Sequence, residues 1–111
     1  MTAAATDPSV RVERDGAVAT LVLNEPRSMN AMSAGIKAGI EDNLPGLLAD
    51  PQVRAIVITG TGKAFCAGGD IRSMDDRGTL SVKTRMTRTY RWLIPLLTAD
   101  KPIICAVNGA A

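Results

Sequence analysis

A glycine-rich loop carries the residues of this chain best placed to do chemistry. It reads Lys63-Ala64-Phe65-Cys66-Ala67-Gly68-Gly69-Asp70-Ile71 and directly follows a strand-like run over residues 55–60. Such a turn leaves backbone N–H groups free, and these stabilise an anion or a developing oxyanion because they carry positive partial charge and need no reorganisation. Glycines in a strand-to-helix turn can also serve only positive φ and close packing, so the local pattern leaves both interpretations open.

A second strand-like run points to the same place. Residues 103–107 are apolar and end in the turn Asn108-Gly109. Ligands of open α/β sheets bind at the carboxyl ends of the strands, where both loops are predicted to lie. The sequence therefore predicts one half of a site at this edge.

The composition excludes several classes of protein. With 111 residues and 46% hydrophobic residues, the chain suits one small folded domain. The net charge of +2 and an aromatic content of 3% give no support for nucleic-acid binding. The absence of histidine excludes a Ser-His-Asp or Cys-His catalytic pair and a His-ligated metal within these residues, so we expect no metal site.

The cysteines, the N-terminal residues and the length of the apolar runs indicate in which cellular compartment the protein is expected. Cys66 and Cys105 lack CxxC spacing and are predicted to be buried thiols in a reducing compartment. Residues 1–9 resemble no signal peptide and are predicted to be a disordered leader. No apolar run is long enough to span a bilayer, so a cytoplasmic protein without membrane partners is expected.

The first half of the chain predicts a hairpin and a helix. Strands over 10–13 and 17–23 flank Asp15-Gly16, which is typical of a type I′ turn. Ser33 is predicted to cap a helix that runs toward Leu44, where Pro45 should kink or end it. Its buried stripe is predicted to be Met32, Ile36, Ile40 and Leu44, and two glycines could allow close approach to another element: Gly35 and Gly39.

The second half alternates strand and helix. Residues 53–59 predict a strand covered on both faces, and 70–74 a short helix that Asp70 would cap. A longer helix is predicted from Ser81 to about Thr98, with a kink or an early end at Pro95. Its predicted inward residues are Val82, Met86, Leu93 and Leu97, and its predicted solvated basic face is Lys83, Arg85, Arg88 and Arg91.

The order of elements favours an α/β fold with a partly parallel sheet. The last strand, over 103–107, needs cover on both faces and partners on both edges, which two helices and few strands do not provide. We therefore expect residues 10–111 to be the N-terminal part of a longer domain.

The glycine-rich loop resembles the hallmark loop of the crotonase superfamily, the enoyl-CoA hydratase/isomerase family. Three other segments match that family in the same order: Asn24-Glu25-Pro26-Arg27-Ser28-Met29-Asn30-Ala31-Met32, Val53 to Gly60, and Lys101 to Gly109. The similarity covers nearly all of the chain from Val10 onward. It implies the N-terminal part of the crotonase-type ββα spiral fold. Glu25 departs from the arginine that is common there, which weakens any expectation of charge pairing at that position.

The resemblance also implies roles for particular residues. Gly69 takes the position whose backbone N–H is the first oxyanion donor to a thioester carbonyl. The acyl-CoA is expected to run along its neighbours Ala67, Gly68, Asp70 and Ile71. The coenzyme A nucleotide and pantetheine are expected at Arg27, Ser28 and Met29.

The implied activity of the intact protein is hydration of a trans-2-enoyl-CoA, with no cofactor beyond the coenzyme A carried by the substrate. Isomerisation, decarboxylation or thioester hydrolysis through the same enolate are alternatives, as is a non-catalytic fragment that binds CoA or joins an assembly. The family implies a homotrimer or a dimer of trimers at full length. The second oxyanion donor and the acid/base carboxylates are expected beyond residue 109, so these 111 residues alone are predicted to be inactive.

Overall fold

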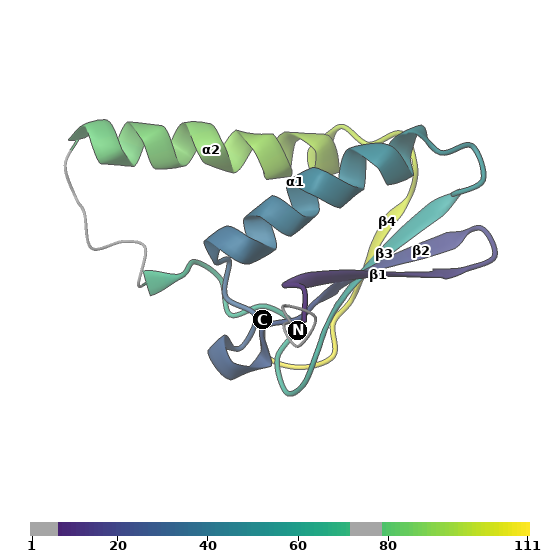
Figure 1. Ribbon diagram of the computed structural model, residues 1–111, viewed down its shortest axis with the longest axis horizontal. Coiled ribbons are helices and arrows are strands. Elements are labelled where there is room, and N and C mark those ends of the chain that lie inside the picture. Colours follow the sequence, from purple (N-terminus) through teal and green to yellow (C-terminus); the bar gives the residue numbers. More distant parts are fainter. Residues whose placement is uncertain (1–6, 72–78) are drawn as a thin grey trace, which may run out of the picture.

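The computed structural model describes residues 7–71 and 79–111 and has a four-stranded sheet with two long helices (Figure 1). The strands are β1 (Val10–Asp15), β2 (Val18–Leu23), β3 (Ala55–Gly60) and β4 (Ile103–Ala106). They lie in the order β1-β2-β3-β4, with β1 antiparallel to β2 and the other pairs parallel. The helices are α1 (Ala34–Ala49) and α2 (Thr79–Leu97). The predicted α/β class is confirmed.

The β1–β2 hairpin forms as predicted but with a different turn. Asp15 pairs with Val18, so the two central residues are Gly16 and Ala17. Gly16 has φ +60° and Ala17 does not share the positive φ. Type I′ needs positive φ at both positions, whereas type II′ needs it only at the first, where glycine is favoured. The prediction of a type I′ turn over Asp15-Gly16 is therefore wrong in two respects. The turn lies one residue further along the chain, and its φ pattern is that of type II′.

Helix α1 covers the sheet with the predicted stripe except for Met32, which precedes the helix and is half-buried. The Ser33 Oγ accepts a hydrogen bond from the Ile36 N–H at 3.2 Å and so caps the helix. Ile36, Ile40 and Leu44 are buried, and Leu47 extends the stripe. Pro45 does not end the helix, which continues to Ala49, because buried Leu44 and Leu47 hold the turns on both sides of the proline against the core.

The predicted close approach at the α1 glycines is confirmed. A Cβ placed on Gly39 would lie 2.5 Å from Val10 Cγ2 and 2.6 Å from Val10 Cβ. A Cβ on Gly35 would meet the Ser9 side chain. The helix can therefore lie directly against the start of β1 only because these positions have no side chain.

Among the described residues, helix α1 covers one face of the sheet and the other face is left partly open. Ile56 and Ile58 of β3 are buried with α1, whereas Val57 and Thr59 on the other face are half-buried. The prediction that this strand is covered on both faces is wrong for these residues. Strand β4 lies at the edge, and Cys105, predicted to be buried, is exposed there because nothing described covers it.

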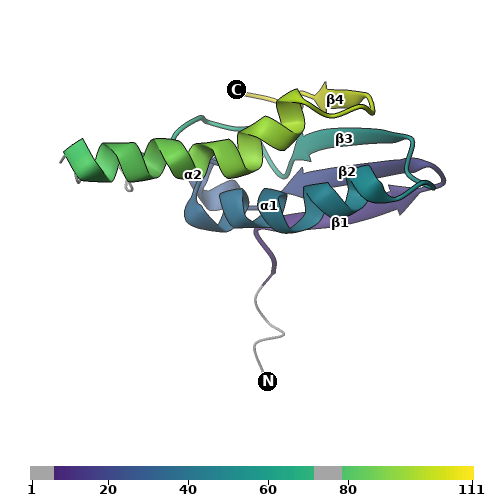
Figure 2. The same ribbon diagram turned by 90° about the horizontal axis from the view of Figure 1, so that it is seen from above.

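Helix α2 lies beside α1 and extends well beyond the sheet (Figure 2). It starts at Thr79, so Ser81 is not its cap, and it continues past Pro95 to Leu97. Trp92 and Leu96 pack against the core. Of the four residues predicted to face inward, Leu93 is half-buried, whereas the other three are exposed: Val82, Met86 and Leu97. The stripe was misplaced because only the C-terminal turns of α2 reach the core.

Other predictions lie partly outside the described residues. The predicted short helix over 70–74 falls mostly within 72–78, and the predicted leader mostly within 1–6. The prediction of disorder is wrong for Pro8 and Ser9, whose carbonyls accept hydrogen bonds from Asn24 at 3.1 and 2.8 Å. No helix in the described ranges has the length and apolarity to cross a bilayer.

Candidate functional site

Two segments far apart in sequence run side by side at the carboxyl ends of β2 and β3. The Ala67 N–H donates to the Met29 carbonyl at 3.0 Å, and the Met32 N–H donates to the Gly68 carbonyl at 2.7 Å. Met32 and Gly69 form an isolated parallel bridge. The segment expected to hold coenzyme A and the loop expected to hold the thioester are thus joined by backbone hydrogen bonds.

The first segment depends on an unusual backbone. After β2 a short 3-10 helix, η2 (Pro26–Ser28), leads into Met29 and Asn30, both at φ +55°. Two neighbouring non-glycine residues in the left-handed region are costly unless local contacts hold them. Asn30 provides those contacts: its Oδ1 accepts from the Glu25 N–H at 2.8 Å, and its own N–H donates to the Glu25 carbonyl at 3.0 Å.

The Asn30 side chain also holds the second segment. It is fully buried, and its Nδ2 donates to the carbonyls of Thr61 and Ala64 at 3.1 and 3.0 Å. From the other side, Asn108 Nδ2 donates to the carbonyls of Gly62 and Ala64 at 3.1 and 3.3 Å. The turn that precedes the glycine-rich loop is therefore fixed by two amides.

The turn after β4 lies against the same loop. The Phe65 N–H donates to the Ala110 carbonyl at 2.8 Å, and the Asn108 Oδ1 accepts from the Gly60 N–H at 3.0 Å. A Cβ on Gly109 would overlap the Lys63 carbonyl, so only glycine allows this approach. The predicted meeting of the two loops at one edge of the sheet is confirmed.

The Gly69 N–H is an unused donor of this arrangement, as is the N–H of the preceding Gly68. Within 7–71 and 79–111 neither N–H has a hydrogen-bond partner, and Gly69 is exposed. The preceding Gly68 has φ +98°, which turns the chain so that its carbonyl meets the Met32 N–H. A free N–H on a backbone held from both sides can donate to a ligand oxygen without rearrangement.

A cleft of about 530 Å³ opens beside this N–H, between the loop and helices α1 and α2. Apolar side chains, namely Met32, Val82, Met86 and Trp92, form much of its lining. Lys37 of α1 and Arg85 of α2 also line it, as do Gly68, Gly69, Asp70 and Thr89. The volume and the mixture of apolar walls with a few polar groups are typical of a small-molecule site.

The predicted site residues take different positions around this cleft. Gly68, Gly69 and buried Asp70 line it, whereas Ala67 and Ile71 are exposed, with Ile71 at 78%. The other three, Arg27, Ser28 and Met29, lie on the neighbouring segment. Arg27 and Met29 are exposed there, and the Ser28 Oγ donates to the Glu25 carbonyl at 3.2 Å.

Sequence reasoning missed several residues of this region, among them Asn30, Asn108, Lys37, Arg85 and Trp92. The two asparagines had a weak signal, since each adjoins a turn in which asparagine tolerates left-handed φ. Arg85 was assigned to a solvated face, and the structure contradicts this because it is half-buried while Lys83, Arg88 and Arg91 are exposed. Trp92 was not assigned to the buried side of α2.

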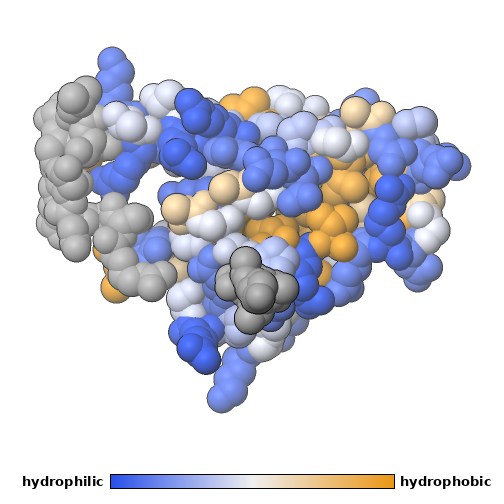
Figure 3. All heavy atoms as spheres, viewed as in Figure 1, coloured by the Kyte–Doolittle hydropathy of each residue, from blue (hydrophilic) through white to orange (hydrophobic). Residues whose placement is uncertain are grey.

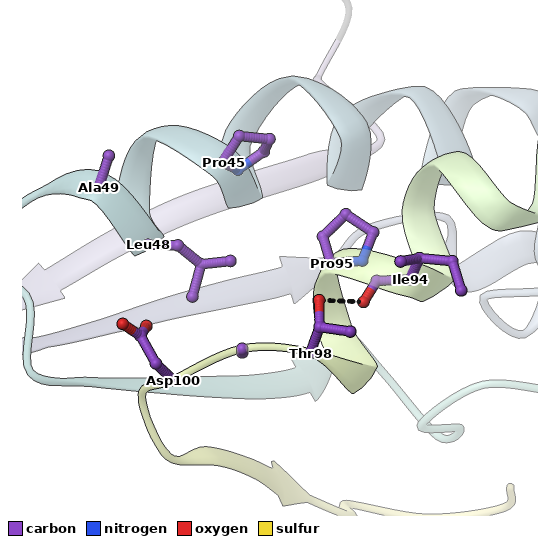
Figure 4. Close-up of a pocket in the computed structure, with 8 residues that line it drawn as sticks. Pro45, Leu48, Ala49, Ile94, Pro95, Thr98 and Asp100 are labelled. Atoms are coloured by element: carbon purple, nitrogen blue, oxygen red, sulfur yellow. Dashed lines mark hydrogen bonds between the residues drawn. The ribbon is translucent and has the colours of Figure 1, made fainter.

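A second cleft, of about 470 Å³, lies between the C-terminal turns of α1 and α2 (Figure 4). Pro45, Leu48 and Pro95 line it, and the Thr98 hydroxyl donates to the Ile94 carbonyl at 2.8 Å. Among the described residues, this cleft and the Gly69 cleft share no lining residue.

In the view of Figure 3, hydrophilic residues dominate along α2, and apolar surface gathers below it over α1 and the strands.

Comparison with known proteins bears on what such a site does. The family model described as enoyl-CoA hydratase/isomerase matches residues 13–111. The chain is 35% identical over 105 residues to the probable enoyl-CoA hydratase EchA14 of Mycobacterium tuberculosis. That match covers 95% of this chain and 41% of the mycobacterial protein. The chain is also 36% identical over 98 residues to the 1,2-epoxyphenylacetyl-CoA isomerase of Escherichia coli, in a match that covers 85% of this chain and 37% of that protein.

A solved structure matches in shape as well. The crystal structure of an enoyl-CoA hydratase from Mycobacterium smegmatis superposes with a TM-score of 0.84 at 31% identity. The match covers 91% of this chain and 40% of that one. The chain thus spans about two-fifths of the length of these relatives.

Proposed function

Because this chain belongs to the enoyl-CoA hydratase/isomerase family, we propose that it forms the part of an acyl-CoA site that holds the thioester carbonyl. The observation that carries the proposal is the Gly69 N–H, which has no partner within the described residues and borders a largely apolar cleft. The acyl group lies in that cleft. The coenzyme A portion lies along Arg27, Ser28 and Met29, beside the loop.

The chemistry follows from where charge develops. When a proton leaves the α-carbon of a thioester, or when water adds to the β-carbon of an α,β-unsaturated thioester and the double-bond electrons move toward the carbonyl, negative charge collects on the carbonyl oxygen. A fixed N–H donor stabilises this enolate more than the neutral carbonyl, and therefore lowers the barrier. The Asn30 and Asn108 contacts keep the loop in place during the reaction, which makes them positioning residues.

The whole protein is proposed to hydrate a trans-2-enoyl-CoA, in line with its similarity to the mycobacterial hydratase. Carboxylates that move protons between water and the α-carbon, and a second N–H donor, would come from outside these 111 residues. Loss of one such donor costs about 10²–10³ in rate, so we expect no measurable hydration from these residues alone. Like its family, the full-length protein is proposed to form trimers.

Isomerisation of a CoA thioester is the second candidate, because the chain is also 36% identical over 98 residues to the 1,2-epoxyphenylacetyl-CoA isomerase. Migration of a double bond would use the same enolate and the same Gly69 N–H as hydration. The two reactions differ in acid/base groups rather than in the part of the site described above.

The test compares two ligands that differ only in the carbonyl oxygen. Butyryl-CoA carries it, and S-butyl-CoA, a thioether, does not. Calorimetric titration should show tighter binding of the thioester by about 2- to 10-fold, the range for one neutral hydrogen bond. Gly69→Pro, which removes the N–H, should abolish that preference, and Gly69→Ala, which keeps it, should not. Equal affinities for the two ligands in the unsubstituted chain would contradict the proposal.

A further inference from the structure

We propose that Lys37 and Arg85 form an anion-binding subsite in the cleft beside Gly69, which holds a carboxylate at the far end of the acyl group. This inference rests on the proposed function and narrows it to acyl-CoA substrates derived from dicarboxylic acids.

Arg85 is the half-buried arginine of α2. Its Nε is closed to solvent and has no hydrogen-bond partner, and its guanidinium forms no ion pair with any described residue. Lys83, Arg88 and Arg91 on the same helix are exposed. Removing a charged group from water is costly unless an opposite charge or hydrogen bonds compensate. A ligand anion at the terminal guanidinium nitrogens would supply that compensation.

Lys37 brings a second positive charge to the same cleft from α1. It too is half-buried, and it makes no ion pair within the described ranges. Among the described lining residues the acid is Asp70, so with its carboxylate counted these residues carry a surplus of one positive charge. A lining of two cations and one acid favours an anionic occupant.

The rest of the lining suits a short carbon chain. Met32, Val82 and Met86 are apolar, and they share the cleft with the Gly69 loop at which the thioester is proposed to sit. A purely aliphatic acyl group would leave both cations without a partner. An acyl group with a terminal carboxylate would satisfy them and still place its methylene groups on the apolar wall. The same cations could in principle hold a phosphate of coenzyme A, so the test must separate the two sources of negative charge.

The experiment uses the fluorescence of Trp92, the single tryptophan of the chain, which lines the cleft. The ligands are glutaryl-CoA and pentanoyl-CoA, which have the same number of acyl carbons but differ in the terminal carboxylate, and free CoA. We expect glutaryl-CoA to bind about tenfold more tightly than pentanoyl-CoA, the usual gain for a charge-assisted hydrogen bond. Arg85→Met should remove this preference for glutaryl-CoA, and Lys37→Met should reduce the preference.

Arg88→Met is the matched control, since Arg88 is an exposed arginine of the same helix outside the cleft lining. It should keep the preference. Glutaryl-CoA binding no tighter than pentanoyl-CoA would overturn the subsite while leaving acyl-CoA binding intact. An equal loss of affinity for free CoA and both thioesters in Arg85→Met would assign the cations to the phosphates and also overturn it. Failure of every CoA ligand to bind would refute the proposed function itself, and the subsite with it.

Discussion

The side-chain amides of Asn30 and Asn108 donate to the same atom, the Ala64 carbonyl oxygen, at 3.0 and 3.3 Å. One asparagine follows β2 and the other follows β4, whereas Ala64 follows β3. The Ala64 carbonyl therefore links the loops that follow three parallel strands, β2, β3 and β4. The loop that presents the Gly69 N–H begins at this point, so its position depends on both amides.

The two asparagines should differ in their effect on stability. Asn30 is fully buried, and Asn30→Ala would leave the Thr61 carbonyl and the Glu25 N–H without that partner. It would also place alanine at a left-handed φ. We expect a loss of about 3 kcal/mol in the free energy of unfolding, measured by urea denaturation. Asn108→Ala, at an exposed position where water can replace the amide, should cost about 1 kcal/mol or less. Equal losses would contradict the burial argument.

Two glycines of α1 should respond to alanine in opposite directions. At Gly46 a Cβ meets nothing within 4 Å, so Gly46→Ala should stabilise the fold by about 0.5–1 kcal/mol through lower chain entropy in the unfolded state. At Gly39 the same Cβ would lie 2.5 Å from Val10 Cγ2. Gly39→Ala should therefore destabilise by about 1–3 kcal/mol, as overpacking does. Thermal unfolding of the two variants gives the comparison, and a stabilising Gly39→Ala would refute the close approach of α1 to β1.

The end of α1 has a pH-dependent contact. The Gln52 backbone N–H donates to the Asp50 carboxylate at 2.9 Å and, together with Arg14 at 3.1 Å, lowers the pKa of Asp50 below its ordinary value. A lowered pKa in the folded state means that the ionised carboxylate adds stability above its unfolded pKa and loses it as the pH falls through the folded one. Asp50→Asn should therefore be less stable than the unsubstituted chain at pH 7, and the difference should vanish near pH 2. A difference that persists unchanged at pH 2 would show that the charge is not its source.

Local patterns in the sequence were enough to predict the order of the elements and the position of the glycine-rich loop over 63–71. The hairpin glycine, the Ser33 cap and the spacing of Ile36, Ile40 and Leu44 each depend on residues within a few positions of one another, and the structure confirms them. The family resemblance, carried by the loop over 63–71, is confirmed by the matches to known enzymes.

What the sequence did not reveal depends on contacts between distant segments. The buried face of α2 was misjudged because its pattern fits a fully packed helix, whereas only the turns near Trp92 and Leu96 reach the core. The role of Asn30 depends on Thr61 and Ala64, about thirty residues away, and no local periodicity reports such a contact. The exposure of Cys105 likewise depends on what covers β4.

The most direct measurement of the central claim is the amide proton shift of Gly69 in a ¹⁵N-labelled chain. Butyryl-CoA should move this resonance downfield, as a new hydrogen bond to the thioester oxygen does, and S-butyl-CoA should leave it in place. Resonances of the cleft residues should shift with both ligands, which shows that both are bound. A Gly69 amide that responds equally to the thioester and the thioether, or to neither while the cleft fills, would contradict the assignment of this N–H as the oxyanion donor.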